Sequence, residues 1–337
     1  MRAVVTGGGG FLGRRLVELL LADGACVTSV SRSSYPELEA LGVRCVETDL
    51  GDAPGCRAAI QGADADVVFH VAAKAGYWGV RADYWKTNVE GTRNVLEACR
   101  AAGVGRLVYT SSPSVCFDGR EHVEASNDLP HARRFLAAYP ASKAAAEALV
   151  LEADGPHLAT VALRPHLIFG PRDPHLVPRL VQRARAGRLF IVGDGRNRVG
   201  LTHVDNAAHA HLCAARALQP GAACAGRAYF VTNEESVVLW DWIAALLERL
   251  GVAPPRRRVP LVVARSAGAL AELTWRALRL SGEPPMTRFL ALQLARTHTY
   301  DMQPARRDLG YTERVGMTEA TESVVRHQEE MRRSYCV

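Results

Sequence analysis

Short hydrophobic runs alternate with helical patterns through the first half of the chain. The helical stretches, such as residues 11–21, space their apolar residues three and four apart, so that one face of each helix is apolar. Repeated strand, helix and strand units build a parallel sheet with helices on both faces, because the crossovers between parallel strands are right-handed. The pattern therefore predicts a doubly wound α/β fold. The predicted strands are 3–6, 26–30, 43–47, 67–71 and 107–111.

The regular alternation fades after about residue 170. Three prolines fall within residues 171–178, and mixed helical segments follow them. Segments of this kind, late in a chain, commonly cover the open edge of a sheet. We predict one large domain over residues 1–170, with its sheet completed by segments up to about residue 210. Residues 171–337 are predicted to form mainly a smaller region that acts as a lid.

A glycine-rich turn joins the first predicted strand to the first predicted helix. Gly7, Gly10 and Gly13 are spaced three apart, and Phe11 and Leu12 lie between the last two. Glycine lets backbone N–H groups approach a pyrophosphate, and the start of the helix adds a partial positive charge. A turn of this kind at this place is typical of a Rossmann dinucleotide-binding domain. We therefore expect the large domain to bind a dinucleotide and the lid region to bind the substrate.

The end of the second strand bears on which dinucleotide binds. A carboxylate there would bind the ribose 2′-hydroxyl of NAD, but the chain has Ser31 and Arg32 instead. A hydroxyl followed by a guanidinium suits the 2′-phosphate of NADP(H), because arginine pairs with phosphate through two hydrogen bonds. We predict NADP(H), with NAD(H) left open. The alternative for Arg32 is an ordinary surface residue in an arginine-rich chain.

Tyr139 and Lys143 are predicted to share one face of a helix. Pro140 favours a first helical turn, and residues four apart face the same way. A phenol, with its pKa near 10, exchanges protons at neutral pH only when its anion is stabilised, and a neighbouring ammonium can do this. Lys143 is also one of only three lysines in the chain. We predict that Tyr139 transfers the proton and that Lys143 lowers its pKa.

The order and spacing of these motifs resemble the extended short-chain dehydrogenase/reductase superfamily. The resemblance covers about residues 1–210 and ends in a later structural signature at His203 to Asn206. It implies that Ser112, after the fifth strand, binds the substrate oxygen, although Ser111 remains the alternative. It also implies further cofactor contacts. For Asp49 among them, the alternative is a helix cap. The contacts are Asp49, Leu50, Ala72, Ala73, Lys74, Asn88, Pro165 and His166.

Within the superfamily, the segments 109–115, 282–289 and 301–311 resemble the 3β-hydroxysteroid dehydrogenase branch. Enzymes of nucleotide sugars usually carry an arginine where this chain has Val199, with Arg198 one place away, which lowers the expectation of such a substrate. The whole chain is most similar to the bacterial reductases of long-chain olefin biosynthesis. That resemblance implies reduction of a 2-alkyl-3-oxoalkanoate to the 2-alkyl-3-hydroxyalkanoate with NADPH, and it leaves open a homodimer and association with other enzymes of that pathway.

Several interpretations stay open. The apolar stretch 261–280, which carries Trp275, could line an acyl tunnel, rest on a membrane surface or form an ordinary core helix. A steroid or sterol dehydrogenase would share every catalytic residue. A redox sensor that binds the dinucleotide without chemistry would have no need of Ser112, Tyr139 and Lys143.

Composition narrows the class. The chain has 41 basic and 35 acidic residues, and the basic ones are scattered, so we expect no nucleic-acid partner. The eight cysteines show no CxxC spacing, which favours reduced thiols and a cytoplasmic protein, and we predict no metal site. We see no export segment, and no stretch reaches the 18 or so uncharged apolar residues of a membrane span.

Overall fold

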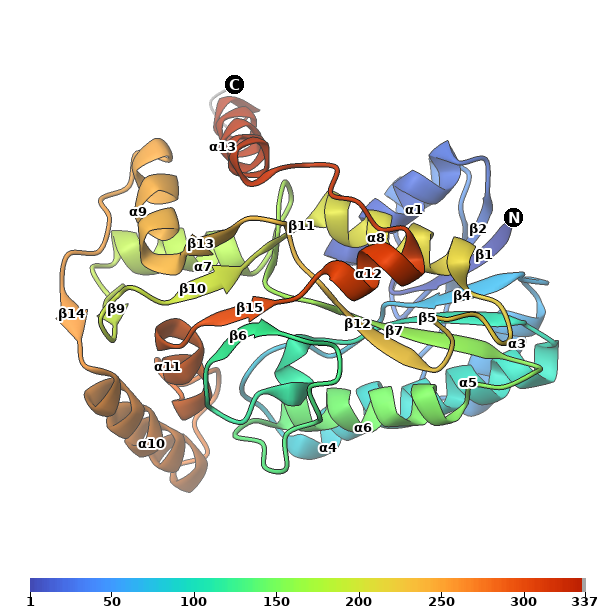
Figure 1. Cartoon of the computed structure of the whole chain (residues 1–337), viewed down its shortest axis with the longest axis horizontal. Helices are drawn as coiled ribbons and strands as arrows, with labels where there is room; N and C mark the ends of the chain where they lie inside the picture. The colour runs from blue at the N-terminus through green and yellow to red at the C-terminus, as the bar shows by residue number, and fades with distance from the viewer. Residues whose placement is uncertain (335–337) are drawn as a thin grey trace.

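The computed structural model describes residues 1–334, and a seven-stranded parallel sheet forms its centre (Figure 1). The strand order is β12-β7-β5-β4-β1-β2-β3. This arrangement confirms the predicted doubly wound α/β fold. The strands are β1 (Arg2–Thr6), β2 (Cys26–Ser31), β3 (Arg44–Glu47), β4 (Val67–His70), β5 (Arg106–Thr110), β7 (Ala159–Pro165) and β12 (Arg227–Val231).

The central strands form where the sequence has its hydrophobic runs. All four residues of β4 and all seven of β7 are buried, as expected for parallel strands covered on both faces. Each of the five predicted strands is present, with ends that differ by one residue or less from those predicted. The edge strand β12 begins at Arg227, so the sheet extends past residue 210, where we expected it to be complete.

Helices cover both faces of the sheet (Figure 1). On one face α1 packs against α8, and on the other α3 packs against α5, which is followed by α6. Their apolar positions at helical spacing supply the two cores, with Leu16 and Leu20 of α1 on one side and Val95 and Leu96 of α5 on the other. The helices are α1 (Phe11–Ala22), α3 (Ala53–Gln61), α5 (Gly91–Ala102), α6 (Ala138–Glu152), α8 (Val204–Ala217) and α12 (Gln303–Leu309), with short α2 (Pro36–Glu39) and α4 (Arg81–Tyr84).

A second lobe has its own sheet and core, which includes Trp242 and Leu246. Its four strands, in the order β13-β10-β15-β6, are β13 (Ser236–Val238), β10 (Arg198–Gly200), β15 (His298–Tyr300) and β6 (His122–Ala125). Two-stranded pairs join β8 (Ile168–Phe169) to β11 (Thr202–His203) and β9 (Ile191–Val192) to β14 (Arg258–Val259). Its helices are α7 (Leu176–Arg185), α9 (Leu239–Arg249), α10 (Leu261–Ala277), α11 (Arg288–Ala295) and α13 (Met317–Ser334).

The two lobes exchange strands. Strand β6 comes from the first half of the chain but pairs with β15 in the second lobe. Strand β12 follows much of the second lobe in sequence but pairs with β7 at the edge of the central sheet. Each lobe is therefore built from both halves of the chain.

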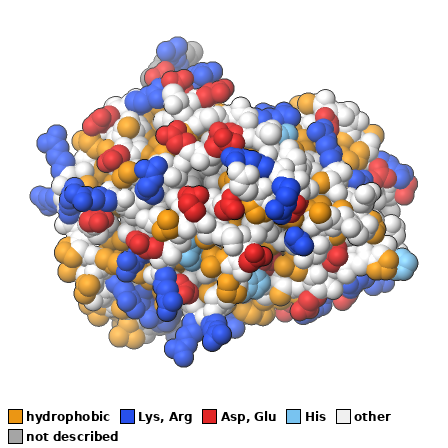
Figure 2. Space-filling model, in the orientation of Figure 1, with side chains coloured by type: hydrophobic (Ala, Val, Ile, Leu, Met, Phe, Trp, Pro, Cys, Tyr) orange, Lys and Arg blue, Asp and Glu red, His pale blue; other side chains and the backbone are white. Residues whose placement is uncertain are grey.

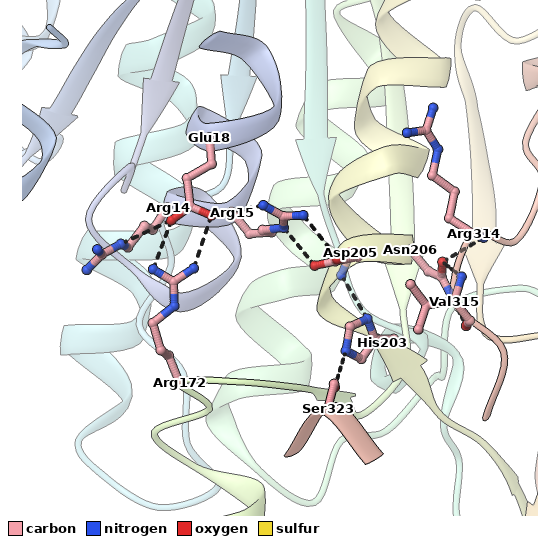
Figure 3. A network of polar contacts seen from close by, with 10 residues as sticks. All are labelled: Arg14, Arg15, Glu18, Arg172, His203, Asp205, Asn206, Arg314, Val315 and Ser323. Atoms are coloured by element: carbon pink, nitrogen blue, oxygen red, sulfur yellow. Dashed lines mark hydrogen bonds and ion pairs between the residues drawn. The ribbon is translucent and has the colours of Figure 1, made fainter. Parts of the chain in front are cut away.

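Ion pairs fix α1 to distant parts of the molecule (Figure 3). Arg15 donates two hydrogen bonds to Asp205 of α8, from Nε at 2.7 Å and from Nη2 at 3.0 Å. Glu18 accepts two more from Arg172, which follows β8, at 2.8 and 3.0 Å. Asn206, beside Asp205, accepts two backbone N–H groups from the segment before α13. The signature at residues 203–206 therefore has a structural role, because it joins α1 and both lobes.

The seven cysteines among the described residues are free thiols, and five of them are buried. Cys26 is exposed and Cys45 is half-buried, while Cys336 lies outside the described residues. Within residues 1–334, no helix combines the length and the apolar character needed to span a bilayer.

Candidate active site

A cavity of about 620 Å³ lies where the two lobes meet. One side is formed by the loops that follow β1, β2, β4, β5 and β7, at the carboxyl ends of the parallel strands. The other side is formed by α7, α9 and α11 of the second lobe. Ligands of open parallel sheets bind at this edge, and the cavity therefore defines the candidate site.

The glycine turn forms the floor of the cavity beside α1. Gly7 has a positive φ of 71°, and a Cβ there would lie 2.9 Å from the Cα of Ala72, so only glycine fits. No side chain caps α1, and its first internal bond joins the N–H of Arg14 to Gly10 O at 2.7 Å. The N–H groups of the residues between them are therefore available to an anion. Gly7, Gly10, Phe11, Leu12 and Gly13 all line the cavity.

Ser31 and Arg32 also line the cavity, at the end of β2. The Ser31 hydroxyl is buried and has no hydrogen-bond partner among the described residues, which leaves it free to bind a ligand. Arg32 is exposed and makes no ion pair with a described residue. An uncapped helix start, an unpartnered hydroxyl and a free guanidinium along one wall fit a dinucleotide with its phosphates.

Asp49 and Leu50 lie on the same wall. The Asp49 carboxylate accepts the N–H of Gly51 at 2.9 Å. Helix α3 begins only at Ala53, with Asp52 at its cap position, so Asp49 does not cap it. The alternative of a helix cap at Asp49 is therefore wrong.

Tyr139 lies in the first turn of α6 and faces the cavity. The Ser112 hydroxyl lies beside its phenol, and it accepts hydrogen bonds from the Ser114 N–H at 3.2 Å and the Ser114 hydroxyl at 2.9 Å. Burial raises the pKa of Tyr139 above its ordinary value, and the nearby Tyr77 phenol adds to this, while the nearby Ser112 hydroxyl opposes it. Ser111 is more deeply buried and faces Glu147, so Ser112 is the serine that meets Tyr139.

Lys143 lies one turn further along α6 and is almost completely buried. Its ammonium donates a hydrogen bond to the carbonyl of Thr110 and lies 4.2 Å from the centre of the Tyr109 ring. Burial lowers the pKa of Lys143 to about 7, and the Glu147 carboxylate opposes this. We expected Lys143 to lower the pKa of Tyr139, but in this structure the end of β5 holds the ammonium and burial dominates at the phenol.

Glu147 lies a further turn along α6 and is a residue that the sequence patterns did not single out. Its carboxylate is fully buried and accepts hydrogen bonds from Arg164 Nε at 3.0 Å, Arg164 Nη2 at 2.6 Å and His131 Nε2 at 2.6 Å. Burial acts to raise the pKa of Glu147, but the bonds from His131 and Arg164 outweigh it and lower the pKa to about 2. Its spacing of four residues from Lys143 was the available signal.

Two predicted cofactor residues, Lys74 and Asn88, do not line the cavity. Asn88 lies in the π-helical turn η1 (Trp85–Glu90), and its side chain bonds both the N–H of Lys74 at 2.7 Å and the Lys74 carbonyl at 3.1 Å. It also donates to the Ser142 hydroxyl at 2.9 Å. The Lys74 ammonium pairs with Asp83 at 3.0 Å. Asn88 therefore fastens the loop after β4 to α6, and it is the neighbouring Ala72 and Ala73 that reach the cavity.

Pro165 and His166 line the cavity after β7. The His166 Nδ1–H donates to the Gly200 carbonyl at 2.6 Å. Burial lowers the pKa of His166 to about 4, so the ring is neutral at pH 7.

The wall from the second lobe is largely apolar, with Phe117, Leu180, Ile243, Phe289 and Leu290 among its residues. Two arginines of α7 also reach it. Arg179 pairs with Glu283 at 3.2 Å, whereas Arg183 makes no ion pair with any of residues 1–334, although the charge of Glu283 is near enough to raise its pKa. Burial and the charge of Arg179 lower the pKa of Arg183.

The sequence patterns missed this apolar wall and placed the tunnel elsewhere. None of residues 261–280 lines the cavity, so the interpretation of that stretch as the tunnel is wrong. Val199 is buried in the core of the second lobe, and Arg198 is exposed and bonded to Ser236, and neither residue lines the cavity.

Comparison with known proteins places this chemistry in a family. Residues 4–261 match the 3-beta hydroxysteroid dehydrogenase/isomerase family. A 2-alkyl-3-oxoalkanoate reductase of Stenotrophomonas maltophilia is 50% identical over 95% of this chain and 97% of its own length. A protein of the same name from Shewanella oneidensis is 45% identical over 94% of this chain and 84% of its own length. The solved structure of MoeE5 in complex with UDP-glucuronic acid and NAD has a TM-score of 0.73 and 26% identity, over 98% of this chain and 100% of that one.

The fold, the glycine turn and the reductase relatives together define an NAD(P)-dependent oxidoreductase. The alternative of a redox sensor without chemistry is thereby set aside. The chain belongs to the 3-beta hydroxysteroid dehydrogenase/isomerase family.

Proposed function

We propose that the protein reduces the 3-oxo group of a 2-alkyl-3-oxoalkanoate to a hydroxyl group, with NADPH as its cofactor. The observation that carries the proposal is the position of the Ser112 hydroxyl beside the Tyr139 phenol, because both line the cavity shared by the glycine turn and the apolar wall. The two relatives named 2-alkyl-3-oxoalkanoate reductase support the substrate class.

The cofactor would lie along the first lobe. The uncapped start of α1 would bind its pyrophosphate, and Ser31 and Arg32 would bind its 2′-phosphate. Lys143 would bind the nicotinamide ribose. When bound, the dinucleotide supplies the hydride that reduces the keto carbon.

The protein's own residues handle the oxygen of the ketone. Ser112 and Tyr139 hold this oxygen, and Tyr139 donates the proton as negative charge develops on it. Because burial raises the pKa of Tyr139, the phenol stays protonated at neutral pH and is ready to act as an acid. This state suits reduction more than oxidation, which would require the phenolate.

The rest of the cavity suits an acid with alkyl arms. The apolar wall can bury hydrocarbon, and the unpaired guanidinium of Arg183 can receive the carboxylate. Arg183→Met should raise the KM for the acid by about tenfold or more and leave that for its methyl ester within about twofold, because only the acid loses a charged partner. Equal changes for acid and ester would assign the carboxylate to another residue.

The substrate class is tested with a series of 2-alkyl-3-hydroxyalkanoates assayed with NADP⁺, beside a 3β-hydroxysterol. Each added methylene that becomes buried contributes about 0.8 kcal/mol, so kcat/KM should rise roughly fourfold per methylene until the cavity is full. A rigid sterol offers no such series. A flat series with faster turnover of the sterol would make the protein a sterol dehydrogenase instead.

A further inference from the structure

The outer face of helix α10 is an exposed apolar surface. Val262, Leu270 and Leu273 of this helix are 75%, 66% and 65% exposed. Among the described residues, six of the eleven exposed large hydrophobic side chains fall between positions 262 and 280. Helix α10 is therefore not an ordinary core helix. The six, called the α10 patch below, are Val262, Val263, Leu270, Leu273, Leu278 and Leu280.

Within residues 256–280, every exposed charged residue is basic. Residues 256–280 contain a single acid, Glu272, which is buried and bonded to the Arg288 guanidinium at 2.8 Å. Six arginines in the same segment are exposed. Figure 2 shows hydrophobic side chains over the position of α10 at the lower left, with basic ones beside them. The arginines are Arg256, Arg257, Arg258, Arg265, Arg276 and Arg279.

The packing of α10 keeps this face turned outward. On the inner face, Gly268 lies so close to the chain before α11 that a Cβ there would be 2.7 Å from the carbonyl carbon of Thr287. Glu272 also accepts the backbone N–H of Arg288 at 2.7 Å. Rotation of α10 would break this bond and bury arginine, so the α10 patch stays exposed in the folded protein.

The α10 patch lies behind one wall of the cavity. Helix α11 and the segment before it line the cavity on one side and contact α10 on the other. The Arg276 guanidinium lies 5.2 Å from the ring centre of Trp78, which also lines the cavity. Whatever binds the α10 patch therefore comes close to the cavity.

We propose that the α10 patch and its six arginines bind the surface of a lipid bilayer that contains anionic lipids. Helix α10 would lie in the plane of the interface, with its leucines among the acyl chains and its arginines at the head groups. A second copy of the chain fits poorly, because an antiparallel pairing of two α10 patches would bring twelve arginines together, while the one acid of each 256–280 segment, Glu272, is buried. The inference stands on the surface alone and is independent of the substrate.

The test is co-sedimentation with vesicles of phosphatidylcholine, with and without roughly 30% phosphatidylglycerol. The wild type should sediment with the anionic vesicles and be released by about 0.5 M salt, since the arginines contribute electrostatically. Leu270→Glu with Leu273→Glu should weaken this binding by about tenfold or more, because two exposed apolar side chains that would enter the bilayer are replaced by charges. The thermal midpoint and dinucleotide binding of this variant show whether it is folded.

The matched control is Leu41→Glu, an exposed leucine on the other lobe, which should bind vesicles like the wild type. Absence of wild-type binding to anionic vesicles overturns the proposal, as does equal binding by the α10 variant. Analytical ultracentrifugation tests whether a second copy of the chain binds the α10 patch instead. A dimer that dissociates in the α10 variant would assign the α10 patch to a second copy of the chain and overturn the lipid assignment.

Discussion

At the scale of single residues, the proposed chemistry depends on Ser112 and Tyr139, which line the cavity side by side. Tyr139→Phe removes the proton donor but leaves the ring, its burial and the cofactor wall. We expect kcat to fall by about 10² to 10⁴ while the affinity for NADPH changes little. Stopped-flow turnover and fluorescence titration of NADPH measure the two quantities. Turnover within a few-fold of the wild type would remove Tyr139 from the mechanism.

Arg32 is the residue on which cofactor choice depends most. It lines the cavity beside the unpartnered Ser31 hydroxyl and makes no ion pair with a described residue. The wild type should prefer NADPH over NADH, and Arg32→Ala should narrow the ratio of their kcat/KM values by about tenfold, because a charged hydrogen bond to the 2′-phosphate contributes roughly 1.5 to 3 kcal/mol. A wild type with equal efficiency for both cofactors would contradict this assignment.

At the scale of elements, helix α6 carries the site. Tyr139, Lys143 and Glu147 repeat at intervals of four residues, so one face of the helix presents all three. The sequence allowed the first two to be predicted, because glycine turn, strand and helix recur in a known order. Glu147 could not be assigned a role, because its partners Arg164 and His131 come from β7 and from the loop before α6. Contacts between distant segments are set by tertiary packing, which local patterns do not contain.

Glu147→Gln tests whether α6 acts as a unit. Glu147 raises the pKa of Lys143 against the effect of burial, so loss of its charge should lower that pKa below about 7. The protonated fraction of Lys143 then falls at lower pH, and the alkaline limb of kcat/KM should move to lower pH. The control is Glu152→Gln at the end of the same helix, which should keep the wild-type profile. If Glu147→Gln lowers kcat/KM at every pH but leaves the position of the alkaline limb unchanged, the role of Glu147 is purely structural.

At the scale of the whole molecule, buried neutral histidines make stability sensitive to acid. Burial lowers the pKa of His70 to about 3 and those of His166 and His211 to about 4, and that of His298 also lies well below its ordinary value. The unfolded chain binds protons below pH 6.5 that the folded protein does not, so stability is lost as pH falls from there. Each such histidine contributes about 1.4 kcal/mol per pH unit to the loss.

Urea denaturation between pH 7.5 and 4.5 measures this dependence. The free energy of unfolding should be nearly level above pH 7 as far as these histidines are concerned, and it should fall steeply below 6.5. His211→Gln is the check on a single histidine, because glutamine can replace the bonds to Thr110 and Ala207 without titrating. In this variant the free energy of unfolding should fall less steeply with pH, by about 1.4 kcal/mol per pH unit. A free energy that stays level down to pH 4.5 would mean that these rings are protonated in the folded state.

The central sheet was predictable and the second lobe was not, for a physical reason. A strand such as β4 is a continuous apolar run, because both faces of a parallel sheet are buried. Strands β10 and β15 have only three residues each, and β9 and β14 only two. Such short strands are defined by their partners, so their sequences carry no periodic signal.

The exchange of strands between the lobes also constrains how the protein can be made. While the chain leaves the ribosome, β6 is synthesised long before its partner β15. In the same way, β7 is synthesised well before its partner β12. Neither sheet can close on a nascent chain of half length, so early hydrophobic segments stay open to chaperones or to neighbouring chains. A gene fragment cut near residue 170 would encode a central sheet without its last strand. Both sheets are therefore complete only when the whole chain has been synthesised.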